Sequence, residues 1–223
     1  MFERNILIID DEEDTEISID AYVDIFDVLK KDMNLNYTLN FHWEKTIEDA
    51  KKILNEKDIV FDTLLIDYDF PNEVIPTKGI NLVKTIRESI NKRCKIVFYT
   101  MHAPHELNSQ EYIDLINNDV FRFVPKDGDL IELKYTNTKF NKSDQLIVEA
   151  IIDSIKDENP VSKALESFLV DYSSILDGLK LTIDGEDYSI QKVLESIRLY
   201  EEPGNKFVQN LLEMSIMDYL EMK

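Results

Sequence analysis

Six polar side chains in this chain of 223 residues have the types and the spacing needed for phosphoryl chemistry. Each lies at or just beyond the end of a short apolar run, and they are Asp10, Asp11, Asp67, Asp69, Thr100 and Lys126. Carboxylates gathered within a few ångströms repel one another unless a cation joins them, and oxygen ligands with open water positions suit Mg²⁺. A carboxylate beside Mg²⁺ can attack a phosphoryl group when a metal, a fixed ammonium and a hydroxyl neutralise the developing charge. These residue types therefore predict a divalent-metal site that can take part in phosphoryl transfer.

The apolar runs predict five buried strands that would bring these side chains together. They cover residues 5–9, 37–43, 63–66, 95–99 and 120–124, and segments of helical spacing follow at 14–31, 46–55, 79–90, 106–116 and 143–156. Alternating strands and helices are typical of a parallel sheet, because parallel neighbours need crossover connections. Ligands of such sheets bind beyond the carboxyl ends of the strands, where all six polar residues would lie. We therefore expect an α/β fold with a five-stranded, parallel, doubly wound sheet.

The C-terminal part of the chain predicts a second, smaller domain. Residues 129–142 lack a clear period and are interpreted as an insertion or loop, and Pro160 marks a break, so we expect domains at 1–158 and 160–223. The second would contain a helix to about residue 176, a hairpin around Asp184 and Gly185, and helices at 190–200 and 205–222. The last helix carries more apolar residues than so small a unit can bury, which leaves a homodimer and docking of a partner both open.

Composition excludes several classes of function. The chain has 45 acidic residues against 25 Lys plus Arg, for a net charge of −20, and residues 160–223 carry 12 acidic and 6 basic side chains. Such a chain repels nucleic-acid backbones and anionic lipid surfaces, so neither is expected as a partner. The lone Cys94 is interpreted as a small buried hydrophobe without a disulfide. No apolar run approaches the roughly 20 residues of a membrane span, and no signal-peptide pattern is visible, so we expect a cytoplasmic protein.

Four motifs together resemble the receiver domain of two-component response regulators, over about residues 4–158. They are Ile-Ile-Asp10-Asp11-Glu12, Leu-Leu-Ile-Asp67-Tyr-Asp-Phe-Pro71, Tyr-Thr100 and Phe123-Val-Pro-Lys126. The resemblance implies a flavodoxin-like receiver sheet in which Asp67 accepts phosphate from a histidine kinase or a phosphotransfer protein. It implies that Asp10 and Asp11 hold Mg²⁺ together with Asp67 and the backbone carbonyl of Asp69. It assigns contacts with the phosphoryl group to Thr100 and Lys126, and the aromatic switch to Phe123.

The resemblance also implies a mode of action. Phosphorylation of Asp67 would alter contacts with a downstream protein, through the acidic helical C-terminal domain. Such a protein is not an enzyme beyond its own phosphoryl transfer and autodephosphorylation.

Three departures from the family keep other interpretations open. Met101 follows Thr100 where a small residue is usual, Lys126 is preceded rather than followed by a proline, and Gly79 lies twelve residues beyond Asp67, which lengthens the intervening loop. A phosphorylation-independent pseudo-receiver that acts as a scaffold or dimerisation module is therefore an alternative.

A third hypothesis is a phosphatase similar to the haloacid dehalogenase superfamily, because Asp67-Tyr68-Asp69-Phe70 fits its Asp-x-Asp-x motif. In that superfamily the motif usually comes before the acidic metal pair, whereas here it follows Asp10 and Asp11, so the receiver is favoured. His102 and His105 follow the fourth strand and are interpreted as loop residues.

Overall fold

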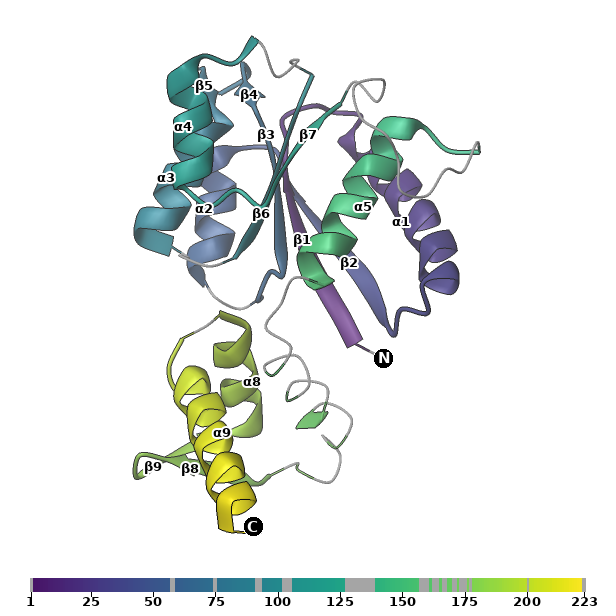
Figure 1. Cartoon of the computed structure of the whole chain (residues 1–223). Coiled ribbons are helices and arrows are strands. Elements are labelled where there is room, and N and C mark those ends of the chain that lie inside the picture. Colours follow the sequence, from purple (N-terminus) through teal and green to yellow (C-terminus); the bar gives the residue numbers. More distant parts are fainter. Residues whose placement is uncertain are drawn as a thin grey trace. The chain divides into compact units, whose positions relative to one another are not determined.

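The computed structural model describes residues 2–56, 59–73, 76–90, 94–101, 106–126, 139–156, 161, 165, 168–169, 172, 176, 178–199 and 201–221 (Figure 1). The chain divides into two units, Met1–Asp157 and Glu158–Lys223. Most of the insertion predicted at 129–142, both loop histidines and most of the helix predicted to end near residue 176 lie outside the described residues.

Five strands of the first unit form one parallel sheet. They are β1 (Phe2–Ile9), β2 (Tyr37–Glu44), β3 (Thr63–Asp67), β6 (Lys95–Thr100) and β7 (Arg122–Pro125). Their order is β2-β1-β3-β6-β7, with every neighbouring pair parallel. Counted along the chain within this sheet, the order is 2-1-3-4-5, which is that of the flavodoxin-like doubly wound fold. The predicted fold class is confirmed.

Helices cover both faces of this sheet (Figure 1). Helices α1 (Thr15–Asp32) and α5 (Lys142–Lys156) lie on one face. The other face carries α2 (Ile47–Glu56), α3 (Gly79–Thr85) and α4 (Ser109–Asn117), and α3 continues into a π-helical segment, Ile86–Ile90. Strand β1, which lies between β2 and β3, is consequently buried on both sides, with Ile6, Leu7, Ile8 and Ile9 all at 0% exposure. This burial explains why its apolar run does not alternate with polar residues.

The loop after β3 folds back as a short antiparallel ribbon that the sequence did not predict. Strand β4 (Asp69–Phe70) pairs with β5 (Thr77–Lys78). Gly79 follows, and its backbone N–H donates to the Tyr68 carbonyl at 2.7 Å. A Cβ atom at Gly79 would lie 1.9 Å from the carbonyl oxygen of Asp67, so only glycine permits this close approach. The longer loop thereby returns the start of α3 to the end of β3.

The second unit contains a hairpin and two helices. The hairpin joins β8 (Lys180–Ile183) to β9 (Glu186–Ser189). Asp184 and Gly185 at its turn have φ of 50° and 88°, as the favoured two-residue hairpin turns require. Helices α8 (Ile190–Leu199) and α9 (Gly204–Glu221) follow. They share a small apolar core, made of Leu169, Ile183, Val193, Leu194 and Ile197 with Phe207 and Val208 of α9 packed against it. None of the helices in the described part of the chain is long and apolar enough to cross a membrane.

Candidate functional site

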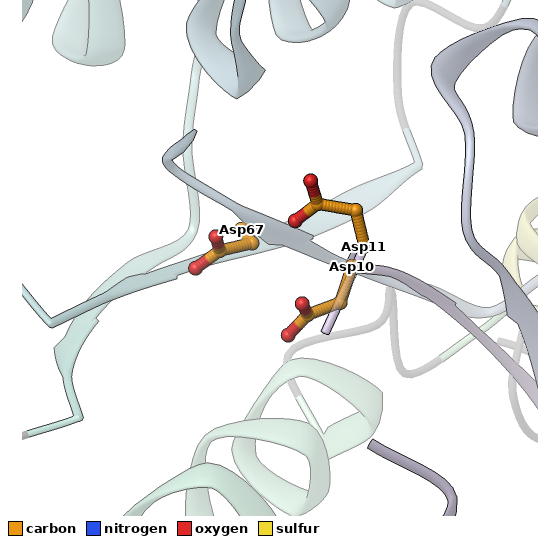
Figure 2. Close-up of side chains that lie close together, drawn as sticks. All are labelled: Asp10, Asp11 and Asp67. Atoms are coloured by element: carbon orange, nitrogen blue, oxygen red, sulfur yellow. The ribbon is translucent and has the colours of Figure 1, made fainter. Parts of the chain in front are cut away.

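The carboxyl ends of neighbouring strands bring three carboxylates together. Asp10 and Asp11 follow β1, and Asp67 ends β3, which pairs with β1 in parallel. One carboxylate oxygen from each residue lies within 4.8 Å of those from the other two. Figure 2 shows Asp10 and Asp11 reaching from one strand end toward Asp67 on the next. The fold thus gathers acidic residues that are separated by more than 50 positions in the sequence.

Two of these carboxylates are almost completely removed from solvent. Asp10 is 2% exposed and Asp67 is 6% exposed. Burial disfavours the charged form and is the largest influence on Asp67, whose pKa is raised to about 6. Lys126 lowers this pKa and the charge of Asp10 raises it, but neither outweighs burial. Asp67 therefore still loses its proton below neutral pH.

Lys126 directs its ammonium into the centre of the site. Its Nζ atom lies 3.2 Å from Asp67 Oδ1, 3.3 Å from Asp10 Oδ2 and 3.5 Å from Glu12 Oε2. The backbone N–H of Lys126 donates to the Thr100 carbonyl at 2.6 Å, which fixes the end of β7 beside β6. Burial by itself would lower the pKa of Lys126, but the neighbouring carboxylates raise it. The residue is consequently a fixed positive charge at neutral pH.

Tyr99 belongs to the site although its role was not predicted. Its hydroxyl donates to Asp10 Oδ2, and its ring lies 4.6 Å from the Lys126 ammonium. The other oxygen of Asp10 accepts from the backbone N–H of Glu12 at 2.9 Å. Burial of Tyr99 raises its pKa well above the ordinary value, so the hydroxyl keeps its proton and remains a donor. Its position immediately before Thr100 was the available signal.

The loop beyond β3 orients the remaining acidic groups. Asn72 donates its backbone N–H to Asp11 Oδ2 at 3.1 Å, and Asp69 donates its own to Asp67 Oδ2 at 3.3 Å. Thr100 ends β6 at 1% exposure, on the same edge of the sheet. The hydroxyl of Thr100 and the backbone carbonyl of Asp69 remain predictions as contacts of a phosphoryl group and a metal.

Phe123 and Met101 occupy different surroundings. Phe123 on β7 is half-buried, with its ring 6.3 Å from that of Phe98, and it packs against the core beneath α2, α3 and α4. Met101 is 65% exposed. It borders a cavity of about 260 Å³ that extends from Asp10 and Lys126 between the first turns of α1 and α5. The Met101 side chain thus lies at the rim of the site. Phe123 packs instead on the face of the sheet that α2, α3 and α4 cover.

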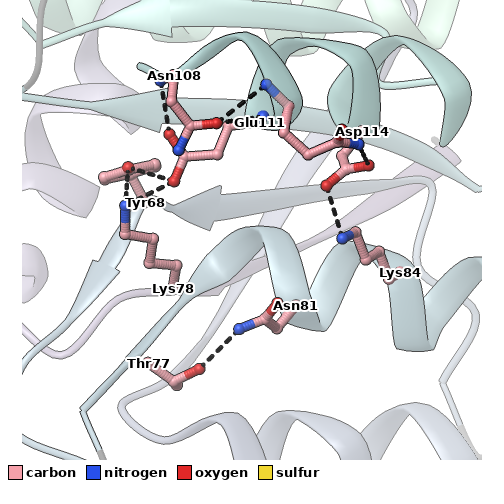
Figure 3. A network of polar contacts seen from close by, with 9 residues as sticks. Tyr68, Thr77, Lys78, Asn81, Lys84, Asn108, Glu111 and Asp114 are labelled. Carbon is pink, nitrogen blue, oxygen red and sulfur yellow. Dashed lines mark hydrogen bonds and ion pairs between the residues drawn. The ribbon is translucent and has the colours of Figure 1, made fainter. Parts of the chain in front are cut away.

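A second polar network joins the residue after Asp67 to helix α4 (Figure 3). The Tyr68 hydroxyl donates to Glu111 Oε1 at 2.9 Å. Lys78 Nζ contacts both the Tyr68 hydroxyl and Glu111 Oε1, the latter at 2.6 Å. Glu111 also accepts from the Asn108 backbone N–H as part of a capping box that begins α4. The three side chains come from distant positions without a shared motif, so no sequence pattern indicated this network.

The donor set at the main site fits a hard divalent cation. Asp10, Asp11 and Asp67 offer carboxylate oxygens, and the group contains neither nitrogen nor sulfur donors. Oxygen-only sites of this kind favour Mg²⁺, Ca²⁺ or Mn²⁺ over Zn²⁺. Gathered carboxylates also repel one another, and a cation relieves that repulsion. The fit is therefore to a divalent metal bound at the carboxyl edge of the sheet.

Comparison with known proteins found similarity to solved structures alone. No family model matches the chain, and no curated protein matches it. The similar structures include the Mn²⁺-bound form of response regulator Rcp1, with 15% identity over 66% of this chain and 91% of that chain, and a TM-score of 0.43. A response regulator receiver domain protein from Clostridium thermocellum is 18% identical over 69% and 94% of the two chains, with a TM-score of 0.42. The receiver domain of the hybrid histidine kinase CckA is 18% identical over 68% and 98%, with a TM-score of 0.37.

Proposed function

We propose that this chain is a signalling response regulator in which Asp67 accepts a phosphoryl group and relays it as altered contact with a downstream protein. One observation carries the proposal. The Lys126 ammonium lies 3.2 Å from Asp67 Oδ1, in a cluster where Asp10 and Asp11 approach the same carboxylate. A nucleophilic carboxylate, a fixed cation and a metal-binding acid pair are the groups that phosphoryl transfer needs.

Each residue has a defined task in this proposal. Asp67 is mostly ionised at neutral pH, since its pKa is about 6, and one of its oxygens attacks the phosphorus. A new O–P bond forms as the bond to the donor nitrogen of a phosphohistidine breaks, and that nitrogen keeps the electron pair. Lys126 binds one phosphoryl oxygen and the hydroxyl of Thr100 donates to another. Asp10, Asp11 and Asp67 would hold Mg²⁺, which neutralises negative charge on the transferred oxygens.

The signal would travel as a shift between two conformations. A phosphoryl group adds negative charge at Asp67, which draws the ammonium of Lys126 and the hydroxyl of Thr100 inward. Lys126 directly follows β7, the strand that carries Phe123, so this movement changes the packing of that ring. A partner that binds one of the two arrangements more tightly then reads the change.

Treatment with a small phosphodonor and Mg²⁺ tests the proposal directly. We expect the intact protein to gain the mass of one phosphoryl group, in a bond that base hydrolyses, and Asp67→Asn to remove this gain. Asp69→Asn is the matched control and should keep the gain, because only the backbone carbonyl of Asp69 is assigned to the site. Retention of the gain in Asp67→Asn, or its absence at high donor concentration, would reject the phosphoacceptor role.

A phosphorylation-independent scaffold is the second candidate, and a specific observation favours it. Lys126 already contacts three carboxylates, so part of the negative charge of the acidic cluster is offset by the chain itself. Trp43 offers a discriminating signal, because its Nε1–H donates to the Asp10 carbonyl at 2.8 Å and it is the sole tryptophan of the chain. A Mg²⁺-dependent change in tryptophan fluorescence that Asp11→Ala abolishes would favour the regulator. A protein that neither responds to Mg²⁺ nor takes up phosphate would be the scaffold.

A further inference from the structure

The polar network next to Asp67 converges on one carboxylate oxygen of helix α4 (Figure 3). Oε1 of Glu111 accepts from the Tyr68 hydroxyl at 2.9 Å and lies 2.6 Å from Nζ of Lys78. The Lys78 ammonium also contacts the Tyr68 hydroxyl, and it lies 4.7 Å from the centre of the Tyr68 ring. We name Tyr68, Lys78 and Glu111 the α4 clamp.

Glu111 is the fixed end of the α4 clamp. Its other oxygen, Oε2, accepts from the Asn108 backbone N–H at 2.9 Å, so the first turn of α4 orients the carboxylate. Burial would raise the pKa of Glu111, but the hydrogen bonds that it accepts, above all from Lys78, outweigh burial and lower it. The bond to Glu111 in turn raises the pKa of Lys78. Both residues are therefore charged at neutral pH, and the clamp contains an ion pair.

The other two clamp residues belong to the segment that holds Asp67. Tyr68 lies between Asp67 and Asp69 in the sequence and is 4% exposed. Its backbone carbonyl accepts from the Gly79 N–H at 2.7 Å. Lys78 pairs with Asp69 in the β4–β5 ribbon and directly precedes Gly79. A displacement of either clamp side chain would therefore move the turn formed by residues 67–69.

This turn carries groups that are assigned to the metal. Asp67 contributes a carboxylate oxygen to the acidic cluster, and the backbone N–H of Asp69 donates to the same carboxylate at 3.3 Å. Further along the loop, the backbone N–H of Asn72 donates to Asp11 Oδ2 at 3.1 Å. The acidic cluster is formed by Asp10, Asp11 and Asp67, and the clamp side chains are not part of it. A change in the clamp would thus reach the metal ligands through the backbone of the turn.

A partly buried ion pair acts more on geometry than on stability. Taking its charges out of water costs free energy that offsets much of their mutual attraction. Groups that orient metal ligands have a larger effect on the metal, because their loss commonly weakens metal binding by about tenfold or more.

We infer that the α4 clamp positions the turn at residues 67–69 and, through it, the oxygen ligands of the divalent metal. Tyr68, Lys78 and Glu111 are positioning residues in this account, since they act through the backbone and not on the metal itself. The inference rests on the metal site of the proposed function, but it does not require Asp67 to be phosphorylated.

A paired substitution tests the inference without leaving a buried charge unpaired. Lys78→Met/Glu111→Gln removes one charge of each sign and keeps the capping box, which glutamine also forms. We expect calorimetric titration to give a Mg²⁺ dissociation constant about tenfold higher than that of the unmodified chain. In the metal-free protein, NMR should show the Gly79 amide exchanging with solvent about fivefold faster or more, because its hydrogen bond to Tyr68 opens more often.

Lys84→Met/Asp114→Asn is the matched control. Lys84 and Asp114 form an ion pair of the same length, 2.6 Å, and Asp114 lies one turn further along α4 than Glu111 (Figure 3). The control removes the same charges, and we expect it to change neither the Mg²⁺ affinity nor the exchange of the Gly79 amide. If Lys78→Met/Glu111→Gln does not fold, Tyr68→Phe decides instead. It keeps the ring, loses one hydrogen bond, and should weaken Mg²⁺ binding by about threefold.

The two readouts separate failure of this inference from failure of the proposed metal site. Unaltered Mg²⁺ affinity in the clamp variant, or an equal loss of affinity in the control, would overturn the inference. Weaker Mg²⁺ binding without faster exchange at Gly79 would place the effect outside the turn and would also overturn it. If the unmodified chain does not bind Mg²⁺, the proposed metal site fails and the metal-free exchange decides. Faster exchange in the clamp variant but not in the control then supports positioning of the turn, and equal exchange rejects it.

Discussion

Lys126 offsets part of the negative charge of the acidic site. Its ammonium contacts Asp10, Glu12 and Asp67, two of which are the carboxylates that would bind a metal. A lysine and a metal that share ligands compete through electrostatic repulsion. At the same time, the lysine is the group assigned to a phosphoryl oxygen. One residue therefore opposes metal binding and promotes phosphoryl transfer.

Replacing Lys126 should separate these two effects. We expect Lys126→Met to bind Mg²⁺ more tightly, by about tenfold, because a positive charge within the site is removed. The same variant should lose phosphoryl uptake, because no ammonium neutralises the transferred oxygens. Calorimetric titration with Mg²⁺ and intact mass after phosphodonor treatment measure the two outcomes. Lys84→Met is the control, since Lys84 pairs with Asp114 on another face, and it should change neither. Weaker Mg²⁺ binding by Lys126→Met would contradict this account.

The raised pKa of Asp67 predicts how stability depends on pH. Its value is about 6 in the folded protein against 3.8 for an isolated side chain, so the folded state binds more protons between these values. Stability therefore falls as pH rises from about 4 to about 6, and the loss persists above that range. Asp67→Asn mimics the neutral form. It should be more stable than the unmodified chain by about 3 kcal/mol above pH ~7, and nearly equal to it below pH ~4. Urea unfolding with a metal chelator present measures this, and a difference that does not vary with pH would count against burial as the cause.

Among the elements, the ribbon of β4 and β5 determines how α3 meets the site. The ribbon returns Gly79 to the Asp67 carbonyl, with space for a hydrogen atom but not for a methyl group. Gly79→Ala would displace either the end of β3 or the start of α3. We expect it to lower the free energy of unfolding by about 2 kcal/mol or more and to weaken Mg²⁺ binding, because Asp67 would move.

Thermal unfolding and a Mg²⁺ titration check the Gly79→Ala prediction. Asn81→Ala in the same helix is the control, as Asn81 is exposed and its side chain donates to the nearby Thr77 hydroxyl. A Gly79→Ala protein with unaltered stability and Mg²⁺ affinity would mean that the loop accommodates a Cβ atom without moving the site.

The elements also explain which parts of the fold the sequence predicted. Strands β1, β3 and β6 each contain an unbroken apolar run, 6–9, 64–66 and 96–99, because both faces of the sheet are covered there, and that signal is visible in the sequence alone. The β4–β5 ribbon has strands of two residues, too short for any periodicity. The π-helical turn after α3 keeps the apolar spacing of an α-helix and was therefore predicted as part of one.

The same contrast holds for the candidate site. Asp10, Asp11, Asp67 and Lys126 could be placed together because each ends a strand of one parallel sheet. Tyr99 could not be assigned, since its contact with Asp10 depends on the direction of a side chain within a strand. Contacts between Lys78 and Glu111 depend on where an unpredicted ribbon meets α4. The order of the strands thus predicts which residues meet at the edge of the sheet. Contacts between individual side chains can be assigned only from the packed structure.

At the scale of the whole molecule, the net charge of −20 works against the folded state. Confining many negative charges in a small volume raises their mutual repulsion, and salt screens it. Any cation therefore stabilises such a protein to some extent. A simple increase in melting temperature with MgCl₂ would not distinguish a bound ion from general screening.

Comparison of Mg²⁺ with Na⁺ at equal ionic strength makes that distinction. Both salts should raise the melting temperature from a low-salt baseline, because both screen the acidic surface. Mg²⁺ should add a further stabilisation of about 1.4 kcal/mol when its free concentration is ten times the dissociation constant. Asp11→Ala should abolish the additional stabilisation by Mg²⁺, because that stabilisation depends on the cluster of Asp10, Asp11 and Asp67. The stabilisation that both salts provide by screening should remain in this variant. Equal stabilisation by the two salts would leave the acidic edge as a screened surface without a metal site.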